Sequence, residues 1–196
     1  MVLIERPNDD DEVLLHPASL TACSSVSNDT ITKFKELENN KSNWTCISTD
    51  NDVLLKQYKE TTIYRLQGHC DVSKERILRM NADFNPDTRR WDPLIKHKTC
   101  QIIEQWEKTP NMIVVEFAWN VSSSLFLPTP TYYCIAVVHT GPNWITFTII
   151  NNHRHAKSPP ETRLHKGWMT LYIHENTIVI MGTLESRHLN LFSKRI

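Results

Sequence analysis

Apolar residues at every second position dominate the later half of the chain. In the segment Met112–Val121 they occupy positions 113, 115, 117, 119 and 121. Side chains of a β-strand point alternately to its two faces, so this spacing predicts a strand with one apolar face. Alternation and turn residues at the boundaries predict five further strands: Thr99–Glu107, Tyr132–His139, Trp144–Asn151, Gly167–His174 and Thr177–Thr183.

The earlier half combines helices with short strands. Behind a cap at Asp29 or Thr30, apolar residues at positions 31, 34 and 37 repeat at helical spacing. Ser73 is the N-cap of a second predicted helix over Lys74–Phe84, and residues 88–93 are predicted as a compact turn or short helix. Three short strands are predicted between these helices: Trp44–Ser48, Val53–Lys59 and Ile63–Cys70. This order predicts an α+β fold with a long antiparallel sheet.

Composition excludes several classes of function. The 22 Lys and Arg residues balance 22 Asp and Glu residues, so no large positive field is available to attract nucleic acid. The four glycines lie far apart, which excludes a glycine-rich phosphate-binding loop. The five cysteines include no CxxC pair, and this usage predicts free thiols in a reducing, cytoplasmic compartment.

The start of the chain contains no hydrophobic targeting core, because Met1–Ile4 runs directly into charged residues. Residues 1–20 are predicted to form a flexible tail, and residues 21–196 to form one domain. The segment Phe117–His153 lacks Asp, Glu, Lys and Arg, which raises the question of a membrane span. Prolines and polar residues keep every apolar run well below the roughly 20 residues that a spanning helix needs, so a buried sheet is the better interpretation.

Several short motifs occur in an order that resembles a known family. They are Trp44 at the first strand, the strand Ile63–Gly68, the helix opening at Ser73, the segment Arg89-Arg90-Trp91-Asp92-Pro93, and the series Asn151–His155, Pro159-Pro160, Arg163 and Gly167. Over residues 44–183 this pattern resembles the START (steroidogenic acute regulatory protein-related lipid transfer) domain. The resemblance implies a helix-grip fold, in which a curved antiparallel sheet wraps a long C-terminal helix and encloses a lipid-sized cavity.

The expected function follows from that resemblance. A START-like domain would bind one lipid internally and transfer or present it between membranes, through transient contact with a membrane surface, without enzymatic chemistry and without a cofactor. A phosphatidylcholine-type phospholipid is the first choice, and a sterol is the alternative. A third possibility is a lipid-sensing or interaction module that transfers nothing.

One feature departs from the family, because only Leu184–Ile196 remain after the last predicted strand. These residues are too few for the long closing helix. The missing wall would then come from the N-terminal segment or from a second copy of the chain, since single soluble domains rarely leave a large apolar trough open to water. An oligomer is therefore possible.

Candidate lipid contacts come partly from the phosphatidylcholine-binding branch of the family. In that branch, aromatic residues at places similar to Trp119, Tyr132 and Trp168 form a cage around the choline group, which aromatic π-faces bind without hydrogen bonds. Asp92 matches the acidic residue on the phosphate side. Thr88 stands where that branch has its partner arginine, so Arg89 is the nearest substitute. Plain core packing for the aromatic residues and helix capping for Asp92 are the alternatives.

Other candidates come from the apolar pattern itself. Phe117 and Phe147 lie on the apolar faces of two predicted strands and are expected to contact the lipid. The loop tip at Leu125 and Phe126 would either touch a bilayer, where burial of one such side chain contributes about 1.5–3 kcal/mol, or fold down as a lid. Pro130 and Thr131 stand where the family usually has an Arg-Asp pair.

The sequence gives little support for a metal site or for a catalytic residue. The pair His153 and His155 lacks the further converging ligands that a metal site needs. Cys134 lies inside a strand, where a small core residue is more common than a nucleophile. Glu116 is expected either on the wet outer face or at a polar headgroup, with alternation favouring the outer face. An enzyme on the same fold would need buried acid–base residues, and the predicted inner face offers almost none.

Overall fold

The computed structural model describes residues 20–50, 52–59, 61–84, 95–120, 131–150, 153–164 and 166–185. At residues 95–99, 119, 120, 131, 132, 161, 184 and 185 the description is limited to the backbone. The expected compact turn or short helix at 88–93, the loop tip at 125–127 and the end of the chain after residue 185 lie outside the described residues.

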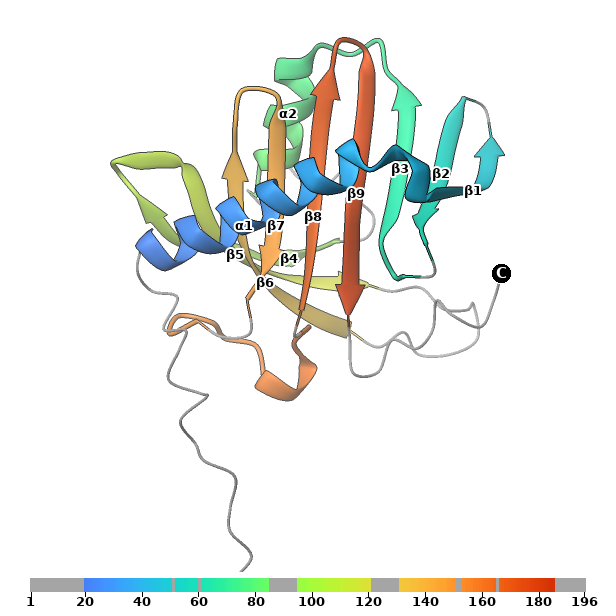
Figure 1. The fold of residues 1–196 in the computed structure, drawn as a ribbon. Helices are drawn as coiled ribbons and strands as arrows, with labels where there is room; N and C mark the ends of the chain where they lie inside the picture. The colour runs from blue at the N-terminus through green and yellow to red at the C-terminus, as the bar shows by residue number, and fades with distance from the viewer. Residues whose placement is uncertain are drawn as a thin grey trace, which may run out of the picture.

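The described residues form one nine-stranded antiparallel sheet with a long helix, α1, on one face and a short helix, α2, on the other (Figure 1). The strand order is β1-β2-β3-β9-β8-β7-β6-β5-β4. The helices and strands are α1 (Leu20–Asn39), β1 (Trp44–Asp50), β2 (Val53–Tyr58), β3 (Tyr64–His69), α2 (Lys74–Ala82), β4 (Ile95–Trp106), β5 (Thr109–Asn120), β6 (Thr131–Thr140), β7 (Trp144–Ile149), β8 (Lys166–His174) and β9 (Thr177–Glu185). Short 3₁₀ turns occupy Lys41–Asn43 and Pro160–Thr162. This is the α+β fold with a long antiparallel sheet that the sequence predicts.

The first helix differs from its prediction, because α1 begins at Leu20 rather than at a cap on Asp29 or Thr30. Its buried side is built from Cys23, Ser27, Thr30, Phe34 and Leu37, which repeat at helical spacing. Three of these five residues are small or hydroxylated. The N-terminal half therefore shows no apolar stripe in the sequence, although the helix is continuous.

The sheet curves toward α2. On that side, one cluster joins residues of α2 to residues from β4 through to β9. On the α1 side the buried residues divide into two clusters, one under each half of the helix. β4 contributes to the curvature through three irregularities in its register with β5, since bulges bend a strand and increase its twist. Figure 1 shows β5 turning across one end of β7, β8 and β9.

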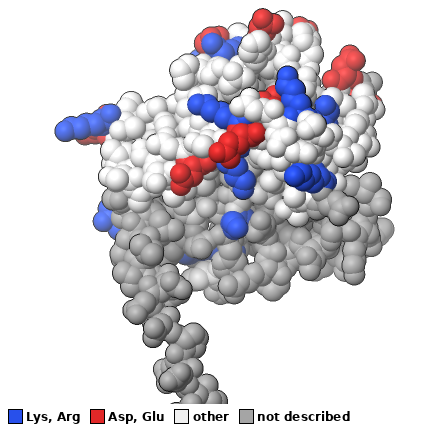
Figure 2. Space-filling view, viewed as in Figure 1, with Lys and Arg blue, Asp and Glu red and all other residues white. Residues whose placement is uncertain are grey.

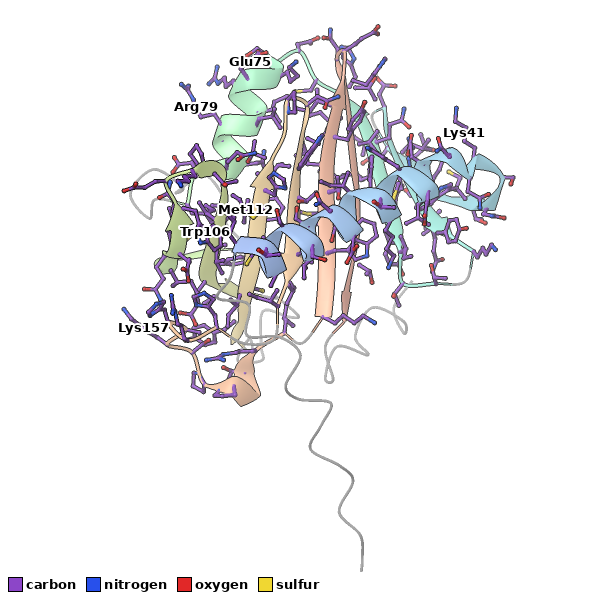
Figure 3. The ribbon with its side chains drawn as sticks, turned by 60° about the vertical axis from the view of Figure 1, so that its left-hand side comes forward. Lys41, Glu75, Arg79, Trp106, Met112 and Lys157 are labelled. Atoms are coloured by element: carbon purple, nitrogen blue, oxygen red, sulfur yellow. The ribbon has the colours of Figure 1, made fainter. Side chains whose placement is uncertain are left out.

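Alternation along the strands assigns each residue to one of these faces. On β5, Ile113 and Val115 join the cluster with α2, whereas Met112 and Val114 join a cluster with α1. We call the face toward α2 the inner face and the face toward α1 the outer face. Figure 3 shows Trp106 and Met112 close together on the β4–β5 pair, beside the beginning of α1.

An ion pair fixes the far end of α1. Arg65 of β3 donates from Nε and from an Nη atom to the two carboxylate oxygens of Glu38, at 3.0 and 2.9 Å. Elsewhere on the face that α1 crosses, acidic and basic side chains are interspersed (Figure 2). This arrangement agrees with the balanced composition of the chain.

The close approach of β8 and β9 requires a glycine. Gly182 pairs with Met169, and a Cβ atom added at Gly182 would overlap the carbonyl oxygen of Trp168 and lie 3.0 Å from Cα of Met169. Both neighbours belong to the backbone of a central strand, so they cannot rotate away. Glycine inside a strand often marks such an approach of one backbone to another.

We expect Gly182→Ala to lower the free energy of unfolding by about 1–3 kcal/mol, because the added methyl forces β8 and β9 apart. The matched control is Gly68→Ala on β3, where an added Cβ would make an ordinary 3.5 Å contact with Val53. That control should change stability by no more than about 1 kcal/mol. Urea unfolding followed by circular dichroism measures both variants, and equal losses would contradict the assignment.

Candidate functional site

The inner face of the central strands is an apolar surface built from distant parts of the chain. Its buried cluster contains no charged residue and consists of Ile77, Leu78, Phe84, Cys100, Ile113, Val115, Ala136, Val138, Ile145, Phe147, Leu171 and Ile173. Further apolar side chains continue this face and are only partly buried: Phe117, Met169, Ile178 and Ile180. Leu66, opposite Ile180 on β3, is 37% exposed. The apolar inner face thus extends beyond the part that is fully covered.

Phe84, just after α2, lies at the centre of the aromatic contacts on the inner face. Its ring centroid is 5.9 Å from that of Phe147 on β7 and 6.3 Å from that of Phe117 on β5. Tilted and edge-on ring pairs at such separations are favourable. The two phenylalanines singled out in the sequence are therefore brought together through a third, Phe84, which the sequence analysis placed only at the end of a helix.

Trp119 and Tyr132 are register partners on β5 and β6. Their pair lies two positions beyond the pair of Phe117 and Cys134, along the same two strands. The backbone therefore brings these two predicted residues side by side. Asp92, Arg89, Leu125 and Phe126 lie outside the described residues.

Trp168 does not join that pair. It lies on the outer face, 6% exposed, in the cluster beneath the second half of α1. Nζ of Lys33 on α1 lies 5.3 Å from the centroid of its indole ring. Trp168 therefore does not belong to the expected cage of three aromatic residues. Strand alternation places Trp168 on the outer face and its neighbour Met169 on the inner face.

Glu116 lies on the outer face, as alternation favours, but it is not in water. Its side chain is 2% exposed, and its carboxylate accepts hydrogen bonds from the backbone N–H groups of Lys157 and Ser158 at 2.9–3.1 Å. It also accepts hydrogen bonds from Ser158 Oγ at 2.5 Å and from Gln101 Nε2 at 2.7 Å. Burial alone would raise the pKa of Glu116, but these hydrogen bonds outweigh burial and lower it.

The segment that Glu116 holds, residues 153–164, packs on the outer face near the beginning of α1 (Figure 3, Lys157). Nε of Arg163 donates to Oγ of Ser158 at 3.0 Å, and an Nη atom of Arg163 donates to the Ser158 carbonyl oxygen. The N–H of Leu164 donates to the carbonyl of Tyr133 at 2.8 Å. Arg163, one of the residues in the family pattern, therefore has a structural role here.

His153 is also structural. Its Nδ1 accepts from the backbone N–H of His155 at 3.2 Å, so the opposite nitrogen, Nε2, carries the proton and donates to Glu104 at 2.9 Å. Burial lowers the pKa of His153 more strongly than the carboxylate of Glu104 raises it. Among the described residues, no group of three or more His, Cys, Asp or Glu side chains could hold a metal ion.

The buried thiols are poor nucleophiles. Burial raises the pKa of Cys23 to about 11 and also raises the pKa of Cys134 strongly. Since the thiolate is the reactive form, neither group is activated at neutral pH.

In the part of the chain that the structure describes, no helix is long and apolar enough to cross a membrane.

Comparisons with known proteins give matches at the level of structure. No sequence model of a protein family matches the chain, and no curated protein matches it in sequence. The fold is similar to that of human StAR-related lipid transfer protein 5, with a TM-score of 0.62 and 11% identity over 89% of this chain and 88% of that one. Human STARD10 gives a TM-score of 0.61 and 13% identity over 95% of this chain and 71% of that chain. The lipid transfer and protein localization domain of human StarD13 gives 0.54 and 12%, over 84% and 88%.

We expect Glu116→Gln to destabilise the protein by about 2 kcal/mol at pH 7, because its amide group replaces a charged acceptor facing two backbone donors. Glu75→Gln is the matched control, since the Glu75 side chain on α2 is 77% exposed. It should change stability by less than about 0.5 kcal/mol. Denaturant unfolding measures both.

The difference between the native protein and Glu116→Gln should depend on pH. The unfolded carboxyl has its ordinary pKa of 4.5, and the folded one lies below that value. The stabilisation by the ionised form is therefore complete above about pH 4.5 and is lost as pH falls through the folded pKa. A difference that stays constant down to pH 2.5 would show that charge is not involved.

Proposed function

We propose that this protein binds a single lipid against the inner face of its sheet and transfers or presents it between membranes. The observation that carries this proposal is the uncharged inner face, which continues from buried residues such as Phe147 to partly buried ones such as Phe117 and Met169. A surface of this kind favours acyl chains or a sterol, since burial of apolar area contributes roughly 25 cal/mol per Å². The likeness in fold supports it further, because two of the three similar structures carry lipid transfer in their names.

The role we propose is non-enzymatic. The buried residues of the inner cluster are apolar apart from the thiol of Cys100, and none of them is a usual acid–base catalyst. Binding and release of the ligand would therefore depend on packing and on movement of the surrounding segments. The apolar tip at Leu125 and Phe126 is proposed to contact the bilayer during exchange.

Among lipids we favour a phosphatidylcholine-type phospholipid. The pairing of Trp119 with Tyr132 supports this choice, because two neighbouring aromatic positions at the end of the apolar row suit a quaternary ammonium group. Asp92 and Arg89 are proposed to lie on the phosphate side. A sterol is the second candidate, favoured by the wholly uncharged cluster deeper on the face.

The first test identifies the ligand. Native mass spectrometry of protein purified without detergent should show one lipid bound per chain, and extraction should return a choline phospholipid. Vesicle-to-vesicle transfer of a fluorescent phosphatidylcholine then measures carriage. If extraction returned a sterol and no phospholipid, lipid binding would stand but the choline cage would be wrong. If neither bound lipid nor transfer were found, the proposed function would be wrong.

The second test addresses the headgroup. Trp119→Ala and Tyr132→Ala should weaken binding of phosphatidylcholine by about 2- to 30-fold, which corresponds to roughly 0.5–2 kcal/mol of cation–π energy. Binding of phosphatidylethanolamine should change much less. The matched control is Trp168→Phe, an aromatic change on the outer face, and it should leave both affinities unchanged. Equal losses for the two lipids would show that no choline cage exists.

A further inference from the structure

The seam between α1 and the sheet is unusually rich in hydroxyl groups. Ser27 and Thr30 lie in the middle of the buried side of α1. Beneath them, on the outer face, Thr146 is the register partner of Thr170, and Thr148 is the register partner of Trp168. Five hydroxyl groups and one indole N–H are therefore buried in this seam. They belong to Ser27, Thr30, Thr146, Thr148, Thr170 and Trp168.

Most of these groups satisfy one another. Oγ of Ser27 is 3.3 Å from Oγ1 of Thr146 and 2.9 Å from Nδ1 of His139. Oγ1 of Thr30 is 2.8 Å from Oγ1 of Thr148 and also donates to the carbonyl of Val26 at 3.1 Å. The helix is thus seated on β7 through two hydroxyl pairs.

Two groups on β8 are different. Nε1 of Trp168 and Oγ1 of Thr170 are buried and have no hydrogen-bond partner within the described part of the chain. Trp168 is 6% exposed and Thr170 is 1% exposed. A buried polar group is very rarely left without any partner, because its desolvation is then uncompensated.

We propose that the seam between α1 and β8 holds an internal water molecule that Trp168 and Thr170 share. An indole N–H can only donate, so its partner must be an acceptor, and a hydroxyl can either accept or donate. Trp168 and Thr170 lie two positions apart on β8, so their side chains project from the same face of the strand, and one water can accept from the indole and also bond to the hydroxyl. The site is polar, as an internal water requires.

Side chains of α1 and β7 lie beside these two groups. Lys33 covers the indole ring from α1, with its Nζ 5.3 Å from the ring centroid. The hydroxyls of Thr148 and Thr30 lie on the adjoining strand and helix. Apart from the Lys33 ammonium, these groups are small hydroxyls, which suit a molecule the size of water. Because the site lies on the outer face, it is independent of lipid bound at the inner face.

Solution NMR tests this proposal on the full chain labelled with ¹⁵N. Trp168→Phe identifies the indole N–H signal of Trp168, which should show a cross-relaxation peak to a long-lived water. Thr170→Val should abolish that peak. The matched control is Thr183→Val, since Thr183 is also buried on β9 but already has a partner in Thr62 at 3.0 Å. It should leave the peak intact.

Two results would overturn the proposal. One is an indole signal without any peak to water, and the other is a peak that survives Thr170→Val, which would show that the two residues do not share the molecule. If Trp168→Phe does not fold, a crystal structure at about 1.5 Å gives the same decision. The proposal requires density for a water within about 3.2 Å of both Nε1 of Trp168 and Oγ1 of Thr170.

Discussion

The structure depends on the curvature of one antiparallel sheet. β4 and β5 turn toward β8 and β9, and residues such as Cys100 and Leu171 belong to one cluster on the inner face. The register irregularities of β4 contribute to the bend, and Gly182 allows β8 and β9 to pass close to each other. The outer face is covered by α1 and by residues 153–164. Hydroxyl pairs and apolar side chains hold α1, whereas hydrogen bonds to Glu116 hold residues 153–164.

The two faces differ in how they are held. The inner cluster is made of hydrocarbon, sulfur and aromatic rings, with Phe84 joining β5 to β7. The outer face uses directional contacts: the ion pair of Arg65 and Glu38, the hydroxyl pairs beneath α1 and the hydrogen bonds to Glu116. Directional contacts fix the geometry of the covering segments, whereas the inner face is held by apolar packing.

The fold could be predicted from the sequence because period-two alternation is strong in β5 to β9 and turn residues mark the strand ends. All nine strands and α2 were placed within a few residues. The N-terminal half of α1 was missed, because its buried residues, Cys23, Ser27 and Thr30, are not apolar enough to form a visible stripe. Pattern recognition depends on hydrophobicity, and this helix docks partly through hydroxyls.

The site was predicted less completely, for two physical reasons. A shift of one position moves a strand residue to the opposite face, so placing Trp168 with the cage failed although the strand itself was correct. The backbone donors to Glu116, Lys157 and Ser158, lie more than 40 positions away in a segment whose path the sequence does not reveal. Alternation gives the face of this residue, but only the fold shows that another segment covers it.

The order of the strands has one further consequence. In the described part of the molecule, β1 and β4 stand at opposite ends of the sheet and each pairs with a single strand. A closed barrel has a girth set by its number of strands and their stagger. An open sheet carries no such constraint, so its curvature is set by the twist and bulges of its strands and by what packs against its two faces.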